Sequence, residues 1–304
     1  MELTLNPREV KLTTRTNTIV RRTLPHKELL MIGAWCFVDH FGPTPQTDGM
    51  VVAAHPHTGL QTVTWLLEGA IEHRDSIGSV QRIEPGQLNL MTAGHGISHS
   101  ELSLRGPQNL HAVQLWVALP EASRDIAPAF EHRHDLPKFD LDGGTATVLL
   151  GTFMGRTAKT TIFSEMVGVE LRLAAGAAIA LELEPNFEYG ILPVEGSLVA
   201  NGEAVSRSAL KYLPISTDAL PRTLHIQATE PTTFLLLGGR PFGEKILMWW
   251  NFIARTNAEI AEQRQQWNDH LENPTGRTRF GEFEDQIGGW IPAPELPNIN
   301  LTPR

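Results

Sequence analysis

Residues 54–69 read AHPHTGLQTVTWLLEG, and residues 91–101 read MTAGHGISHSE. Side chains alternate between the two faces of a β-strand, so His55 and His57 share one face, and so do His99 and Glu101. On facing strands these four side chains would converge on one point. Three imidazoles and one carboxylate suit a divalent first-row metal such as iron, manganese, nickel, copper or zinc.

The residues between these two motifs are typical of strands and turns. Residues 61–68 are rich in β-branched and aromatic side chains and end at Gly69. A Glu-Pro-Gly turn at residues 84–86 precedes the apolar run at residues 88–91. This pattern predicts a metal site inside a small β-barrel.

The two motifs resemble the metal-binding motifs of the cupin barrel, and their exact residue sequences resemble those of the pirin family in particular. Residues 39–43 (DHFGP), 237–241 (LGGRP) and 249–252 (WWNF) also match pirins, so the resemblance spans nearly the whole chain. It implies an all-β fold of two cupin barrels in tandem, followed by a C-terminal helix. It also implies that a metal, usually iron, is held in the N-terminal barrel by His55, His57, His99 and Glu101.

The resemblance implies two alternative functions, because some bacterial pirins oxidise quercetin whereas vertebrate pirins are nuclear, iron-dependent transcriptional co-regulators. The first function is a quercetin 2,3-dioxygenase-type oxidoreductase that opens the heterocycle of a flavonol with O₂. The second is a non-catalytic redox or metal sensor that acts through protein partners. Iron(II) is the expected cofactor, with manganese, nickel, cobalt, copper and zinc as alternatives.

The ligand set favours catalysis over a purely structural role. Four protein ligands leave two open positions on an octahedral metal, enough for a bidentate substrate or for a substrate and O₂, whereas a structural site normally fills a tetrahedron. In an enzyme, Glu101 would be both a ligand and the general base that accepts the hydroxyl proton of the substrate. It would then have to loosen from the metal during turnover.

Two positions depart from the family pattern. Many cupins and pirins have a glutamate four residues after the second histidine, where this chain has Gln61. A neutral amide is a poor ligand, so we expect Gln61 not to bind the metal. His95 stands in a glycine-flanked loop where relatives often carry arginine. It either contacts the substrate or faces solvent, and we place the solvent-facing alternative ahead.

Further histidines lie outside the two motifs. His73 and Asp75 share one face of a predicted hairpin, and we expect that face to be solvated. His132 and His134 form another His-x-His pair, but their charged neighbours and the lack of a later His-x-Glu predict a surface position. His111 begins a predicted barrel strand, where it either lines the metal cavity or caps the core.

Length and composition bound the class of protein. The chain has 304 residues, enough for two domains, and 41% hydrophobic against 19% charged residues predicts a globular protein. The formal net charge is −9, which disfavours direct binding to nucleic acid. We expect a monomer whose partners are a small aromatic substrate and O₂, with a protein partner under the sensor alternative.

The cysteine content and the N-terminus predict a cytoplasmic protein. The single cysteine, Cys36, excludes an intrachain disulfide and fits a reducing compartment, and its apolar neighbours predict a buried, inert thiol. The first residues lack the basic and apolar regions of a signal peptide, and no apolar run is long enough to span a membrane. We therefore expect a soluble protein without membrane contact.

The second half of the chain repeats the strand pattern of the first half. Aligning the Glu-Gly pairs at residues 68–69 and 195–196 places Glu182 and Glu184 where the first two histidines stand. This repeat predicts a metal-binding barrel over residues 1–141. It predicts a second barrel without a transition-metal site over residues 142–304, a domain that also includes the C-terminal helix and tail.

A helix is predicted near the C-terminus. Thr256 followed by Glu259 is a capping-box signature, and the residues up to His270 are good helix formers. An apolar stripe that would pack onto a barrel is formed by Ile253, Ile260 and Trp267. From Ile291 the tail is rich in proline, which predicts an extended or poorly ordered segment.

Overall fold

The computed structural model describes residues 2–12, 18–45, 49–104, 109–216, 220–272, 278–282 and 288–303. These residues form two compact units. Unit 1 comprises the described residues within Met1–Val10, Val20–His40 and Arg133–Phe242, and unit 2 comprises those within Lys11–Ile19, Phe41–His132 and Gly243–Arg304.

Four strands precede the two histidine motifs. They are β1 (Leu3–Leu5), β2 (Arg8–Lys11), β3 (Ile19–Leu24) and β4 (Trp35–Pro45). Cys36 on β4 is a free, buried thiol, as its apolar neighbours predicted.

Unit 2 carries both motifs on one antiparallel sheet. Its strands, in spatial order, are β5 (Val51–His57), β10 (Ile97–Ser103), β7 (Ile71–Asp75) and β8 (Val80–Ile83). A further set of neighbouring strands in this unit consists, in spatial order, of β12 (Ala129–Arg133), β9 (Leu88–Thr92), β6 (Leu60–Glu68) and β11 (Asn109–Ala118).

Side chains from these two sheets meet in the interior of unit 2. The ring centroids of His57 on β5 and Trp116 on β11 lie 5.1 Å apart. The Thr64 hydroxyl on β6 lies 3.4 Å from Oε1 of Glu101 on β10. The motif-bearing sheet therefore turns its histidine face inward, toward β6 and β11.

The register of β10 aligns the two motifs with each other and with β7. His99 lies opposite His55 on β5, and the register shifts between His99 and Glu101. On its other edge β10 pairs with β7, where His99 lies opposite Asp75 and Glu101 lies opposite His73. Because directly opposed residues point to the same face of an antiparallel sheet, all of these side chains are on the inner face.

Unit 1 is a second β-barrel with an apolar interior. Its larger sheet contains β1, β21 (Leu210–Leu213), β18 (Glu188–Glu195), β23 (Thr232–Gly239), β16 (Met166–Leu173), β14 (Gly144–Phe153) and β13 (Lys138–Leu141) in this order, with β15 (Arg156–Thr157) paired to β14. Its smaller sheet contains β17 (Ala178–Leu183), β22 (Arg222–Ala228), β19 (Leu198–Ala200) and β20 (Glu203–Val205).

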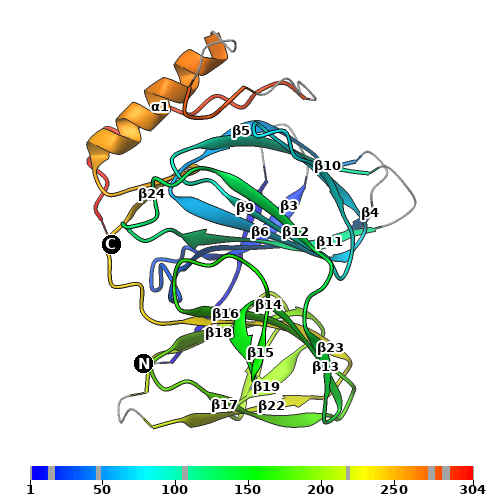
Figure 1. Ribbon diagram of the computed structural model, residues 1–304. Helices are drawn as coiled ribbons and strands as arrows, with labels where there is room; N and C mark the ends of the chain where they lie inside the picture. The colour runs from blue at the N-terminus through cyan, green and yellow to red at the C-terminus, as the bar shows by residue number, and fades with distance from the viewer. Residues whose placement is uncertain are drawn as a thin grey trace. The chain divides into compact units, whose positions relative to one another are not determined.

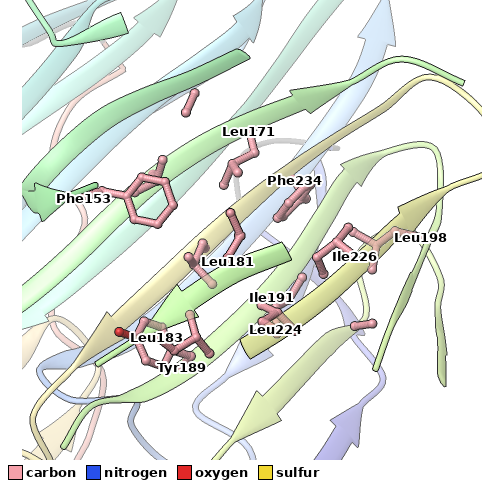
Figure 2. Packing of buried hydrophobic residues seen from close by; sticks show 14 of the residues in the cluster. Phe153, Leu171, Leu181, Leu183, Tyr189, Ile191, Leu198, Leu224, Ile226 and Phe234 are labelled. Carbon is pink, nitrogen blue, oxygen red and sulfur yellow. The ribbon is translucent and has the colours of Figure 1, made fainter. Parts of the chain in front are cut away.

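Aliphatic and aromatic side chains from both sheets fill the interior of unit 1. Leu181 on β17 and Ile226 on β22 belong to one buried cluster with Leu171 on β16 and Phe234 on β23, as Figure 2 shows. The corresponding space in unit 2 holds histidines and a glutamate. Burying polar groups is unfavourable unless they are paired or bound, so a polar interior marks unit 2 as the one with a site.

The C-terminal part of unit 2 contains β24 (Leu247–Trp249), β25 (Phe252–Ala254) and helix α1 (Asn257–Glu272). Helix α1, orange in Figure 1, packs against β24 and β25 through a stripe that includes the fully buried Ile260 and Trp267. The predicted capping box is present, because the Thr256 hydroxyl accepts the Glu259 N–H (3.2 Å) and the Glu259 carboxylate accepts the Thr256 N–H (3.3 Å).

In the C-terminal tail, the described residues 288–303 form no helix, and hydrogen bonds link them to β5. The Ala54 N–H donates to the Gly289 carbonyl (3.1 Å), and the Ile291 N–H donates to the Ala54 carbonyl (2.9 Å). The tail therefore lies along β5. The sequence predicted an extended or poorly ordered segment, and it did not predict this pairing.

The prediction of two all-β barrels and a C-terminal helix is confirmed. The boundary between residues 141 and 142 stays a prediction, and by its contacts α1 belongs to unit 2. Among the described residues no helix has both the length and the hydrophobicity that crossing a membrane requires.

Candidate metal centre

Three histidines from the two motifs form one buried cluster. One ring nitrogen each of His55, His57 and His99 lies within 4.8 Å of the others. His57 and His99 are only 1% exposed, and His55 is 7% exposed. The two Nε2 atoms of His57 and His99 lie 3.1 Å apart. The period-two argument thus identified side chains that meet in the fold.

Glu101 joins this cluster through His99. A carboxylate oxygen of Glu101 lies within 4.8 Å of one ring nitrogen each of His99 and His73. The Thr64 hydroxyl lies 3.0 Å from Gln114 Oε1 and 3.4 Å from Glu101 Oε1, and these two oxygens share its proton. The sequence therefore identified four side chains that lie together, and their role as metal ligands remains a prediction.

Burial keeps the three imidazoles neutral at neutral pH. Loss of solvation lowers the pKa of His55 to about 4, although its hydrogen bond to the Ala53 backbone acts in the opposite direction. Burial and the neighbouring histidines also lower the pKa values of His57 and His99 well below the ordinary value. A neutral imidazole has a free lone pair, which is the form that binds a metal.

Burial has the opposite effect on the carboxyl group. It raises the pKa of Glu101, although the hydrogen bond from the Thr64 hydroxyl acts to lower it. A divalent cation beside Glu101 would favour its ionised form, because opposite charges attract strongly where solvent is excluded.

The donor set fits a divalent transition metal. His55 Nδ1 lies 2.9 Å from the Ala53 carbonyl, which only accepts, so Nδ1 carries the proton and Nε2 carries the lone pair. Two ring nitrogens 3.1 Å apart, as in His57 and His99, need a shared proton or a shared cation between them because two lone pairs repel. Three neutral nitrogens and one carboxylate oxygen are ligands that first-row metals accept.

The expectation of a solvated outer face at His73 and Asp75 is wrong. The two residues are 3% and 4% exposed, and His73 Nδ1 lies 3.3 Å from His99 Nδ1. The hairpin was predicted correctly as β7 and β8. Its pairing with β10 turns the face with His73 inward, and this long-range register has no signal in the local sequence.

The two departures from the family pattern have different surroundings. Gln61 is fully buried on β6, and its Nε2 donates to Thr92 Oγ1 (2.9 Å). His95 is half-buried, and its backbone N–H donates to the Ile126 carbonyl (2.9 Å).

The other histidine pair lies away from the cluster. His132 is half-buried and has its Nδ1 2.8 Å from Asn89 Oδ1, and His134 is exposed. On β11, Trp116 contacts a cluster histidine. His111 is 2% exposed and lies at a register shift of this strand, and neither metal-capable group found among the described residues includes it.

In unit 1 the positions that align with the first histidine pair are exposed glutamates. Glu182 accepts a hydrogen bond from the Thr223 hydroxyl (2.6 Å), and Glu184 also faces solvent. The metal-capable groups found among the described residues all lie in unit 2.

Comparison with known proteins agrees with this arrangement. Residues 15–117 match the family model described as pirin, and residues 168–271 match the pirin C-terminal cupin domain. A Pseudomonas aeruginosa protein that is provisionally named a quercetin 2,3-dioxygenase is 45% identical over 280 residues, which cover 91% of this chain and 86% of that protein. A pirin-like protein of Caulobacter vibrioides is 33% identical over 291 residues, covering 92% of this chain and 95% of that protein.

A solved structure extends the similarity to the whole fold. The crystal structure of a quercetin 2,3-dioxygenase from Acinetobacter baumannii superposes with a TM-score of 0.92 and 39% identity, covering 99% of this chain and 97% of that one. Both halves of the chain, the fold and the histidine motifs lead to one conclusion. The chain belongs to the pirin family.

Proposed function

We propose that this protein is a metal-dependent dioxygenase that opens the heterocycle of a flavonol such as quercetin with O₂. The observation that carries the proposal is the meeting of three neutral imidazoles and one carboxylate in the interior of unit 2. Two relatives that cover most of the chain, at 45% and 39% identity, have names that give this activity.

We assign the metal to His55, His57, His99 and Glu101. Family resemblance favours iron(II), while the nitrogen and oxygen donors are also compatible with manganese, nickel, cobalt, copper and zinc. A bound metal would supply a Lewis acid at this site, which would favour the deprotonated form of the flavonol hydroxyl.

The four cluster residues differ in exposure, so one side of the cluster is closer to solvent than the other. His57 and His99 are almost fully buried, whereas His55 and Glu101 keep exposed fractions of 7% and 8%. Trp116 lies against His57 and keeps a similar exposed fraction of 7%. We assign the side of His55 and Glu101 as the one from which a substrate would approach, with Trp116 as an apolar surface for an aromatic ring.

Glu101 is the group that we assign to accept the flavonol hydroxyl proton. Burial raises the pKa of the metal-free carboxyl group, so Glu101 is a stronger base than a carboxylate in water once it has loosened from the metal. The Thr64 hydroxyl holds Oε1. The other oxygen is the atom to which the proton would move.

A metal or redox sensor that acts through a protein partner is the second candidate. The low exposure of the cluster favours it, because a sensor needs the metal and its ligands but no room for a flavonol. The two candidates share the metal site and differ in turnover.

Quercetin turnover in air distinguishes them. The full-length protein is stripped with a chelator and loaded in turn with Fe(II), Mn(II), Ni(II), Co(II), Cu(II) and Zn(II), and the metal content is measured. We expect loss of flavonol absorbance and release of carbon monoxide with at least one metal. Glu101→Gln replaces the anionic ligand with a poor one, so it should bind the metal more weakly, and its turnover per bound metal should also fall because the proton acceptor is lost. Stoichiometric metal with no quercetin turnover for any of the six would count against an enzyme for that substrate and favour the sensor.

A further inference from the structure

A second pair of buried polar residues lies behind His99, outside the four residues assigned to the metal. His73 and Asp75 are 3% and 4% exposed, and His73 Nε2 lies 3.0 Å from Asp75 Oδ2. On its other side, His73 Nδ1 lies 3.3 Å from His99 Nδ1. The three side chains form a row that ends at the cluster.

Asp75 determines which atoms donate and which accept along this row. Its Oδ1 accepts the backbone N–H groups of Ile77 (3.0 Å) and Ser79 (2.9 Å), which hold the side chain in the β7–β8 turn. Its Oδ2 faces His73 Nε2. A carboxylate only accepts hydrogen bonds, so His73 Nε2 is the donor.

The proton on His73 Nε2 fixes the proton on His99. A neutral His73 that donates from Nε2 has its lone pair on Nδ1, and this lone pair faces His99 Nδ1. His99 Nδ1 must then carry a proton, which leaves the lone pair of His99 on Nε2. This is the nitrogen that lies 3.1 Å from His57 Nε2 in the cluster.

Packing holds His73 in the orientation that this row requires. Phe130 on β12 stacks on the His73 ring, with centroids 4.5 Å apart and an interplanar angle of 16°. The His73 ring is therefore held by its stack on Phe130 and by its contacts with Asp75 and His99.

We propose that Asp75 and His73 form a hydrogen-bond relay that holds His99 as its Nδ1–H tautomer, so that His99 Nε2 is available to the metal. The relay makes His73 and Asp75 positioning residues and not ligands. The inference rests on the proposed metal binding. Metal-bound histidines commonly donate their other N–H to an acceptor that orients the ring and increases its basicity. His55 has this arrangement in a simpler form, with the Ala53 carbonyl as acceptor.

The contrasting assignment is a second metal beside the first. Ring nitrogens of His73 and His99 and a carboxylate oxygen of Glu101 also lie within 4.8 Å of one another. In that case His73 would be a ligand, His99 would bridge two ions, and the protein would take up two equivalents of metal. The relay predicts one equivalent.

Asp75→Asn tests the relay while preserving the turn. The asparagine carbonyl can still accept the Ile77 and Ser79 N–H groups, but its NH₂ group now faces His73 Nε2. His73 must then accept at Nε2 and carry its proton on Nδ1. That proton is donated to His99 Nδ1, and His99 Nε2 becomes protonated toward the cluster. Replacing one carboxylate oxygen with an NH₂ group therefore reverses the donor and acceptor roles along the whole row.

Zinc affinity gives the first measurement. Zn(II) binding to the full-length protein is measured by competition with a chromophoric chelator. We expect one equivalent in the wild type and about a 10- to 100-fold loss of affinity in Asp75→Asn. Glu28→Gln is the matched control, because Glu28 pairs with His26 (3.5 Å) in unit 1 and is 55% exposed. It should bind zinc as the wild type does.

The tautomers themselves give the second measurement, one that a merely structural role would not change. Long-range ¹H–¹⁵N spectra of the zinc-loaded protein with labelled histidine report which ring nitrogen carries each proton. The wild type should show His99 protonated at Nδ1 and His73 protonated at Nε2. His73→Phe keeps the stack on Phe130 and removes the acceptor, so the Nδ1–H signal of His99 should lose its hydrogen-bonded shift.

The outcomes separate this inference from the proposed function. Binding of one zinc by the wild type, weakened in Asp75→Asn but not in Glu28→Gln, supports the relay. Unchanged zinc affinity in Asp75→Asn, or His99 protonated at Nε2 in the wild type, overturns the relay and leaves the metal site standing. Two equivalents of zinc also overturn it. No zinc binding by wild-type protein would instead reject the metal site on which the proposed function depends.

Discussion

The Nε2 atoms of His57 and His99 lie 3.1 Å apart, although the residues are 42 positions apart in the chain. Their strands β5 and β10 are hydrogen-bonded neighbours, with His57 opposite Ile97 and His55 opposite His99. Strand alternation then turns all three rings to one face. The cluster is a direct result of this register.

Removing one cluster histidine should remove the metal. His57→Ala deletes a ligand from the middle of the site, so the variant should lose most of its bound metal in elemental analysis after dialysis. His132→Ala is the control, because His132 contacts Asn89 and lies outside the metal-capable groups found in the described residues. Equal metal content in the two variants would refute the ligand assignment.

Gln61 should matter for stability and not for metal binding. Gln61→Ala removes the hydrogen bond to Thr92 in a fully buried position and should lower the free energy of unfolding by about 1–3 kcal/mol. Its metal content should match that of the wild type. Urea unfolding and elemental analysis of the same preparation measure both effects. Folded Gln61→Ala that loses its metal would show that the amide is a ligand after all.

Acid should destabilise the metal-free protein over a defined pH range. Burial lowers the pKa of His55 to about 4 from the ordinary histidine value of about 6.5, and it lowers the pKa values of His57 and His99 well below that ordinary value. Between about pH 4 and about pH 6.5, the unfolded chain therefore binds more protons than the folded chain. The free energy of unfolding is therefore highest above about pH 6.5 and falls toward pH 4.

His55 alone would contribute about 3 kcal/mol to this loss. Glu101 acts in the opposite direction, because burial raises its pKa and the folded chain binds its proton first as the pH falls. Urea unfolding in the presence of chelator, at about pH 7 and about pH 5, measures the change. His55→Asn should show a smaller loss between the two pH values. A variant that follows the wild-type curve would mean that His55 is not the group responsible.

The capping box should stabilise α1 by a measurable amount. Thr256→Ala removes the acceptor of the Glu259 N–H, and the free energy of unfolding should fall by about 1 kcal/mol. Thr256→Ser keeps the hydroxyl and should restore most of this stability. Thermal unfolding followed by circular dichroism compares the three proteins. Identical midpoints for Thr256→Ala and Thr256→Ser would contradict a capping role.

The sequence predicts which residues share a face of a strand better than it predicts which strands pair with each other. His55, His57, His99 and Glu101 could be selected because alternation within a strand is a local property. His73 could not, because alternation tells which residues share a face and not which face is inward. That choice is made by the pairing of β7 with β10, and it brings His73 opposite Glu101.

The C-terminal segment shows the same division between local and long-range information. Thr256 and Glu259 lie three positions apart, so their capping box can be read from the sequence. The pairing of the tail with Ala54 joins residues more than two hundred positions apart, and an extended proline-rich segment carries no signal for its partner strand. Contacts of this kind become visible only in the fold.

The most direct test of the central claim is an anomalous difference map from crystals of the metal-loaded protein, recorded at the absorption edge of the metal. We predict one peak in unit 2, within about 2.3 Å of a ring nitrogen of His55, His57 and His99 and of a carboxylate oxygen of Glu101. A fully loaded crystal with no peak there, or with its peak beside Glu182 and Glu184 in unit 1, would contradict the assignment.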